Sequence, residues 1–160
     1  MNLTVIAATL LPFAGAIPIP FITKRNRSSW YDHLQKPSWI PPRWALGTIW
    51  SVLYAGMGYS SYLVYKEGGD TMALVLYSLQ LLLNWAWTPI FFGLHNVKLA
   101  AYEILAFWVA VAACGMKFFT INTVAGMLFI PYLFWVTFAM TLTFNIWSKN
   151  GDKPEPVKEK

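Results

Sequence analysis

Five long apolar runs, separated by short polar segments, constrain this chain more than any other feature of its sequence. None of the runs alternates apolar and polar residues with the period of a β-strand. A helix that spans a bilayer needs about 20 predominantly apolar residues, and each run has that length. The sequence therefore predicts an all-α integral membrane bundle of five transmembrane helices, forming a single domain over residues 1–148. The predicted spans are residues 3–23, 44–65, 72–94, 97–119 and 123–147.

The charges of the chain also fit a membrane protein. Charged residues make up 12% of the sequence, whereas an ordinary soluble domain has about 25%. A net charge of +5 could suggest nucleic-acid binding. The lysines and arginines, however, lie in loops and tails that flank the apolar runs, where such residues orient helices and attract anionic lipid. We therefore expect membrane lipid as a partner, and no nucleic acid.

The distribution of the cations predicts an orientation in the membrane. All lysines and arginines except Lys66 and Lys117 fall on the side that carries the first loop, the turn at His95 and the C-terminus. By the positive-inside rule, this side faces the cytoplasm. Residues 149–160 are charged, contain proline and lack aromatic residues, which predicts a disordered cytoplasmic tail. The N-terminal run has no preceding cationic segment, so we expect neither a cleaved signal nor a transit peptide.

The connection between the first two runs is unusually long for a compact bundle. It extends from Lys24 to Arg43 and contains Trp30, Trp39 and several prolines. Connections of this length are commonly functional or disordered. Because this one is rich in aromatic residues, we expect an ordered loop that covers one mouth of the bundle as a lid.

Motifs of common enzymes and metal sites are absent from the sequence. There is no HExxH, CxxC, phosphate-binding glycine loop or GxSxG. His33 and His95 lie on different elements, without nearby cysteines, and Cys114 lies inside an apolar run. We therefore expect no metal site, no required cofactor and no catalytic residues of a familiar kind.

Two polar residues lie within the predicted spans. Glu103 is the one acidic residue in any span, and polar groups in a membrane interior commonly have a function. Glu103 could contact a ligand, or it could pair with Lys98 or a loop arginine. Asn84 could bind a ligand carbonyl or bridge two helices. The sequence leaves both alternatives open.

Aromatic residues make up 18% of the chain, and several tryptophans lie deeper than the membrane interface, where anchoring tryptophans are expected. An indole has a flat polarisable face and one N–H donor, which suits a large planar apolar ligand. Each indole taken alone could equally pack against another helix. Taken together, Trp50, Trp85, Trp87 and Trp135 come from three predicted helices and favour a binding pocket inside the bundle.

Three segments carry a resemblance to a known family. They are WYDHLQKPSWIPPRW at residues 30–44, NWAWTPIFFG at residues 84–93 and PYLFW at residues 131–135. Together with Ile49 and Trp50, they resemble the signature segments of the translocator protein, or tryptophan-rich sensory protein, family. The resemblance extends in order over roughly residues 5–150 and includes the aromatic first loop.

The resemblance implies a five-helix bundle, often a homodimer, with a pocket beneath the first loop. The family's ligands include porphyrins such as protoporphyrin and haem, sterols, and synthetic drugs of the isoquinoline and benzodiazepine types. In bacterial relatives, tryptophans matching Trp50 and Trp135 are associated with light-dependent porphyrin breakdown. The ligand-binding residues that the resemblance implies here are Trp30, Leu34, Trp39, Arg43, Leu46, Ile49, Trp50, Asn84, Trp87, Phe91, Trp135, Phe138, Ala139 and Leu142.

Three departures from the family pattern limit the transfer. The tyrosine of a sterol-recognition pattern near the end of the last helix is replaced by Phe144. Val75 and Leu79 occupy positions of a small-residue dimer motif, and Leu99 replaces a tryptophan.

The leading hypothesis from the sequence is a membrane translocator or receptor that binds porphyrins. Cholesterol and drugs are further ligand classes. The alternatives are a tryptophan-dependent, light-driven porphyrin-degrading enzyme that uses Trp50 and Trp135, and a membrane scaffold whose tail binds a partner. The segments NWAW and KPSW resemble animal members of the family most closely, which predicts the mitochondrial outer membrane.

Overall fold

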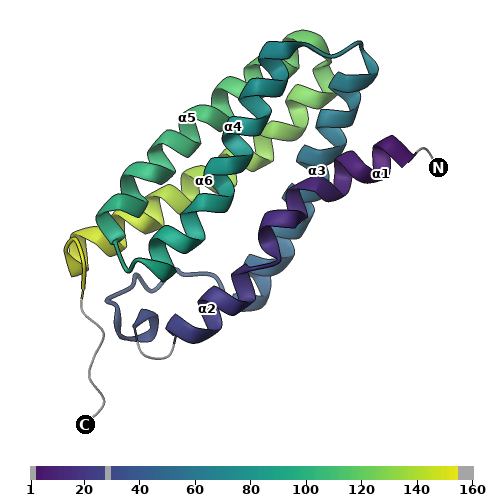
Figure 1. Ribbon diagram of the computed structural model, residues 1–160. Helices are drawn as coiled ribbons and strands as arrows, with labels where there is room; N and C mark the ends of the chain where they lie inside the picture. The colour runs from purple at the N-terminus through teal and green to yellow at the C-terminus, as the bar shows by residue number, and fades with distance from the viewer. Residues whose placement is uncertain (1–2, 28–29, 155–160) are drawn as a thin grey trace.

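The computed structural model describes residues 3–27 and 30–154, and within these residues it contains helices and connecting loops but no strand. The helices form an elongated bundle with the two chain ends at opposite ends of its long axis (Figure 1). The predicted all-α class is confirmed. The elements are α1 Leu3–Leu10, η1 Leu11–Ala16, α2 Ile19–Arg27, η2 Tyr31–His33, α3 Arg43–Lys66, α4 Thr71–Thr88, η3 Pro89–Gly93, α5 Val97–Ile121 and α6 Thr123–Asn150.

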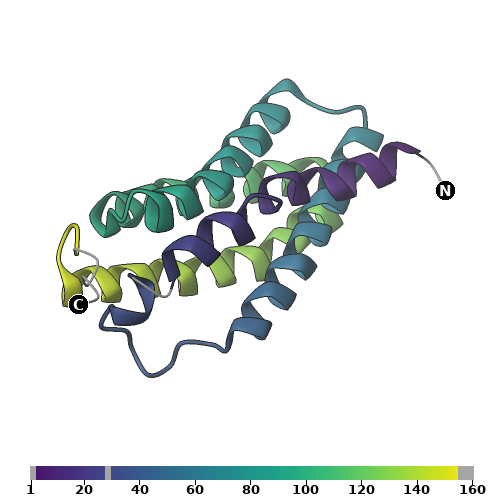
Figure 2. The same ribbon diagram turned by 60° about the horizontal axis from the view of Figure 1, so that its bottom comes forward.

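The first apolar run forms three consecutive helical pieces rather than one straight helix. Pro12 and Pro18 lack the N–H group that a continuous α-helix needs, and a 3₁₀ segment, η1, lies between α1 and α2. The indole N–H of Trp85 donates a hydrogen bond to the Pro12 carbonyl over 3.1 Å. As a result, α1 packs on α3 whereas α2 packs on η3, and the first run crosses the bundle (Figure 2).

The other four helices pack in the order α3, α6, α5 and α4. A glycine brings α1 close to α3. A Cβ atom at Gly58 would lie 2.6 Å from the carbonyl oxygen of Ala8 and 2.6 Å from the Cα atom of Thr9. The same device recurs between α5 and α6, where a Cβ atom at Gly126 would lie 2.5 Å from the Cα atom of Phe119.

Four segments of the described chain are long and apolar enough to cross a membrane: Leu3–Lys24, Thr71–Gly93, Val97–Ile121 and Thr123–Asn150. The fifth predicted run forms α3, which is a full-length helix of the same bundle. It is less apolar than the others because it contains serines such as Ser60 and Ser61 and several glycines. The hydroxyl of Ser60 donates to the Ala125 carbonyl over 2.8 Å, so its polar group faces α6 rather than lipid. The architecture is that of a helical membrane protein.

A π-helix ends the third apolar run. Pro89 cannot donate to the preceding turn, and the helix widens over Pro89–Gly93 before it ends. Single π-turns are frequently found at functional sites. This one presents Phe91 and Phe92, both buried, towards the segment that precedes α3.

The connection between the first two membrane helices is shorter than the predicted loop from Lys24 to Arg43. Helix α2 extends to Arg27 and α3 begins at Arg43, while residues 28–29 lie outside the described part. Residues 30–42 contain the single 3₁₀ turn η2. An ordered lid over the whole predicted length therefore stays a prediction.

At the other end of the chain, α6 extends to Asn150, which lies inside the predicted tail. Residues 151–154 then contact the bundle. The remainder of the tail, residues 155–160, lies outside the described residues.

Candidate functional site

The described part of the first loop packs against η3 and the end of α6. Trp30 is only 1% exposed and lies in one apolar cluster with Leu34, Phe91 and Phe92. The rings of Trp30 and Phe91 are 5.3 Å apart in an edge arrangement, which is a favourable geometry for two aromatic rings. We call this group the lid cluster. Its buried members are Trp30, Leu34, Phe91, Phe92, Val97, Ala100 and Ile146.

The chain after α6 holds the loop in place. The indole N–H of Trp30 donates to the Pro154 carbonyl over 2.8 Å. Asn150 forms a reciprocal pair with the backbone of Gln35, accepting from its N–H and donating to its carbonyl, each over 2.8 Å. These bonds join segments more than one hundred residues apart and attach the loop to the C-terminal segment.

Asp152 anchors the same segment to the start of α5. Its carboxylate accepts a hydrogen bond from the Trp147 indole over 2.8 Å and pairs with Lys98 over 3.0 Å. The hydrogen bond from Trp147, followed by that from Lys98, lowers the pKa of Asp152. Asp152 therefore stays ionised at neutral pH, as its pair with Lys98 requires.

His95 lies against the outer part of the lid cluster. Its ring is 4.5 Å from the Trp30 ring with 30° between the planes, and its φ of 51° is a left-handed conformation that is uncommon for a residue other than glycine. Its Nε2 atom is buried without a hydrogen-bond partner among the described residues. Burial lowers the pKa of His95, so the ring beside Trp30 is neutral at pH 7.

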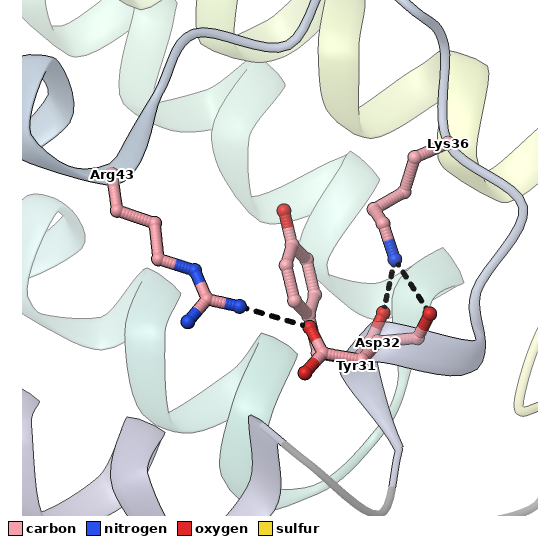
Figure 3. Close-up of polar contacts among 4 residues, drawn as sticks. All are labelled: Tyr31, Asp32, Lys36 and Arg43. Atoms are coloured by element: carbon pink, nitrogen blue, oxygen red, sulfur yellow. Dashed lines mark hydrogen bonds and ion pairs between the residues drawn. The ribbon is translucent and has the colours of Figure 1, made fainter.

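Charged groups lie at the mouth of the bundle, beside η2. The Arg43 guanidinium donates to Asp32 over 3.2 Å, and the two side chains are 65% and 45% exposed (Figure 3). Lys36 Nζ donates to the carbonyls of Tyr31 and Asp32 over 2.6 and 3.1 Å, which stabilises the turn (Figure 3). Partial burial lowers the pKa of Lys36, although Asp32 offsets part of this effect.

A continuous row of aromatic rings extends from this loop into the bundle. Trp39 contacts Phe138 at 5.5 Å, and Phe138 stacks on Trp135 at 5.1 Å. Trp135 then meets Trp50 edge to face at 6.4 Å, and Trp50 lies 5.6 Å from Tyr54. We call these five residues the aromatic row. It combines the loop, the beginning of α3 and the middle of α6.

The inner end of the aromatic row meets a buried polar network. The Tyr54 hydroxyl donates to Asn84 Oδ1 over 2.6 Å, and Asn84 Nδ2 donates to the Tyr132 hydroxyl over 3.1 Å. The Tyr132 hydroxyl in turn donates to Gln80 Oε1 over 2.9 Å. Asn84 thus bridges α3, α4 and α6, and its amide is satisfied by protein groups.

Two indole N–H groups near the row have no acceptor. The Nε1 atoms of Trp87 and Trp135 are buried without a hydrogen-bond partner among the described residues. Trp87 stacks on Phe91 at 4.8 Å and packs against both the lid cluster and the main core. Buried donors usually find a partner, so these two groups offer hydrogen bonds to a molecule that enters this region.

Most of the residues implied by the resemblance lie in two connected groups, which are the lid cluster and the main core with the aromatic row. Trp30, Leu34, Phe91 and Leu142 belong to or pack on the lid cluster, and Trp87 joins it to the core. Ile49, Trp50, Trp135 and Ala139 pack on the core, while Trp39 and Phe138 belong to the aromatic row. Arg43 is exposed and paired with Asp32, Leu46 is half-buried near the beginning of α3, and Asn84 belongs to the polar network.

Several residues of this region were not identified from the sequence. Tyr54, Tyr132 and Gln80 complete the polar network, and the position of Tyr132 inside the PYLFW segment was a usable signal. Trp85 was grouped with the deep tryptophans, but it packs on Gly15 of the first run and bonds Pro12, outside the aromatic row.

A separate apolar groove of about 260 Å³ lies between α5 and α6. Met116, Phe119 and Ile130 line it and are more than 40% exposed, so it opens on the outer surface of the bundle. Its lining contains none of the residues implied by the resemblance. Among the described residues, no group of histidines, cysteines and carboxylates could hold a metal ion.

The chain is similar in sequence to one protein family and to several of its members. The model of the TspO/MBR family matches residues 8–148. The human protein named Translocator protein is 47% identical over 147 residues, which cover 89% of this chain and 87% of the relative. The Tryptophan-rich sensory protein of Cereibacter sphaeroides is 39% identical over 150 residues, covering 92% and 95%. The human Translocator protein 2 is 32% identical over 159 residues, covering 94% of each chain.

Proposed function

Since this chain belongs to the TspO/MBR family of membrane translocator and sensor proteins, we propose that it binds porphyrins inside the helix bundle. Cholesterol and drugs of the benzodiazepine and isoquinoline types are further ligand classes of the same proposal. The observation that carries it is the pair of buried, unpartnered indole N–H groups of Trp87 and Trp135 beside the aromatic row. Flat aromatic walls bind a planar apolar ligand, and unpartnered donors select one with acceptor atoms.

The mouth of the bundle supports a ligand that carries a carboxylate. Arg43 and Asp32 form an ion pair that is largely exposed to solvent, and such pairs contribute only about 0–1 kcal/mol. Exchanging Asp32 for a porphyrin propionate therefore costs little, while a guanidinium can bind a carboxylate through two hydrogen bonds. In this proposal, Arg43 orients the ligand, and the loop residues of the lid cluster, Trp30 and Leu34, cover it.

The proposed location is the mitochondrial outer membrane, with the first loop and the C-terminus facing the cytoplasm. The excess of cations on one side of the membrane supports the orientation. The resemblance of the NWAW and KPSW segments to animal members of the family supports the location. The loop before α3 and the C-terminal end of α6 lie at the same end of the bundle, as this orientation requires (Figure 1). Fractionation of cells expressing the protein, with protease access to a C-terminal tag, tests both statements.

The binding test is a titration of the purified protein with protoporphyrin in the dark, followed by tryptophan fluorescence. A Trp50→Phe, Trp135→Phe variant keeps the aromatic packing but lacks the two indoles of the row that lie on α3 and α6. We expect saturable quenching in the wild type and weaker binding in the variant. A Trp44→Phe variant is the matched control, because Trp44 is 75% exposed. Equal affinity in all three proteins would contradict the proposed site.

A second candidate function is light-dependent porphyrin degradation. The observation that favours it is the direct edge contact between Trp50 and Trp135 at 6.4 Å, since adjacent indoles are suited to one-electron oxidation near a bound chromophore. Illumination of the complex should then bleach the porphyrin absorbance in the wild type. A Trp50→Phe variant that still binds porphyrin should bleach more slowly, and equal rates would exclude this function for Trp50.

A further inference from the structure

Glu103 is a buried carboxyl group that the protein leaves without a partner. It lies on α5 within a membrane-spanning segment, is 9% exposed, and neither carboxyl oxygen has a hydrogen-bond partner among the described residues. Burying such a group in an apolar interior is costly unless something compensates for it. A leucine at this position would avoid the free-energy cost of burying a carboxyl group, which indicates that the carboxyl group has a function.

Two of the cations that could have paired with Glu103 are engaged elsewhere. Lys98, five residues earlier on the same helix, binds Asp152 over 3.0 Å. Arg43, the first residue of α3, binds Asp32 over 3.2 Å. The structural ion pair that the sequence suggested for Glu103 is therefore absent from the described residues, and the other alternative, a contact with a ligand, is left.

The position of Glu103 on α5 points towards the ligand site. Residues three and four apart lie on the same face of a helix. Ala100 is fully buried in the lid cluster, and the Phe107 ring lies 6.1 Å from that of Tyr132, which belongs to the polar network. Glu103 lies between these two contacts on the same face. Trp87 also packs on both the lid cluster and the core.

We propose that Glu103 is the ligand contact contributed by α5, and that it accepts a hydrogen bond from an O–H or N–H group of an otherwise apolar ligand. This inference rests on the proposed binding function and adds a residue to it, because none of the positions implied by the resemblance lies on α5. The hydroxyl of a sterol has the required chemistry, whereas the pyrrole N–H groups of a porphyrin point into the centre of the ring, out of reach of a side chain. Glu103 thus selects ligands with a donor, whereas Trp87 and Trp135 select acceptors.

The test uses two sterols that differ in the donor alone, cholesterol and its 3-O-methyl ether, each measured by competition against protoporphyrin. Glu103→Leu should weaken the binding of cholesterol by about 5–30-fold, as for a lost buried hydrogen bond, and should leave the binding of the ether unchanged. Glu103→Gln keeps an acceptor oxygen and should retain most of the affinity for cholesterol.

A stability measurement separates this role from a structural one. Because Glu103 has no partner in the protein, Glu103→Leu should unfold at a temperature equal to or higher than the wild type. A lower unfolding temperature would show that the carboxyl group has a protein partner and would overturn the inference. Equal affinity changes for cholesterol and its ether would also overturn it, while leaving the binding function intact. If the wild type binds protoporphyrin but not cholesterol, this inference alone fails. If the wild type binds neither saturably, the binding function fails as well.

Discussion

The contact between α1 and α3 gives a stability prediction whose magnitude follows from the structure. A methyl group added at Gly58 would meet backbone atoms of Ala8 and Thr9 at 2.6 Å, and backbone cannot move aside as a flexible side chain can. Overpacking of this kind costs about 1–3 kcal/mol. Gly56 lies two residues earlier on the same helix, and nothing lies within 4 Å of a Cβ atom built there. Gly56→Ala is therefore a matched control.

Both substitutions remove a glycine from a helix interior, which by itself stabilises by about 1 kcal/mol. This gain cancels in the comparison, so Gly58→Ala should be less stable than Gly56→Ala by about 1–3 kcal/mol. For a chain of this size, that corresponds to an unfolding temperature lower by about 2–12 °C. The chain has one cysteine, Cys114, which is fully buried. A thiol-reactive dye therefore reports unfolding directly, and equal unfolding temperatures for the two variants would refute the close contact.

Three further predictions concern the polar network and the lid. Asn84→Leu leaves the Tyr54 hydroxyl without its acceptor and should destabilise the bundle by about 1–3 kcal/mol in the same dye assay; no change would mean that the network is dispensable. Burial beside Trp30 lowers the pKa of His95. His95 therefore binds a proton more readily when residues 30–42 detach from the bundle, so the attached loop should become less stable as the pH falls below about 6.5. Hydrogen exchange of residues 30–42 should then rise in the wild type but not in His95→Asn, and a flat profile in the wild type would contradict this. Asn150→Ala breaks the reciprocal bonds to Gln35 and should increase the same exchange at pH 7, whereas an unchanged rate would show that the C-terminal segment does not hold the lid.

Much of the fold could be predicted from the sequence because the membrane imposes a simple length rule on apolar runs. Four of the runs form helices that are long and apolar enough to span a bilayer, and the fifth forms α3. The length rule does not predict which local helix geometry forms where a proline interrupts a run. Pro12 and Pro89 change the local hydrogen bonding, but whether a helix then kinks, tightens to η1 or widens to η3 depends on the neighbours that pack against it.

The sequence indicates which types of residue lie deep in the bundle, but not which of them contact one another. The deep positions of Trp50 and Trp135 followed from their places in apolar runs, and the structure brings them into contact. By contrast, Trp85 has the same sequence context as Trp87 but faces the first run, because two residues along a helix differ by more than half a turn. The bond between Trp30 and Pro154 joins distant segments and left no local signal in the sequence.

In the proposed function, a planar ligand binds between the aromatic row and the lid cluster. A crystal structure of the protein with bound protoporphyrin, from crystals grown in a lipid mesophase, would locate this ligand. We expect the porphyrin ring against Trp50 and Trp135, with a propionate at Arg43. A porphyrin bound instead in the outer groove between α5 and α6, beside Met116 and Ile130, would contradict it.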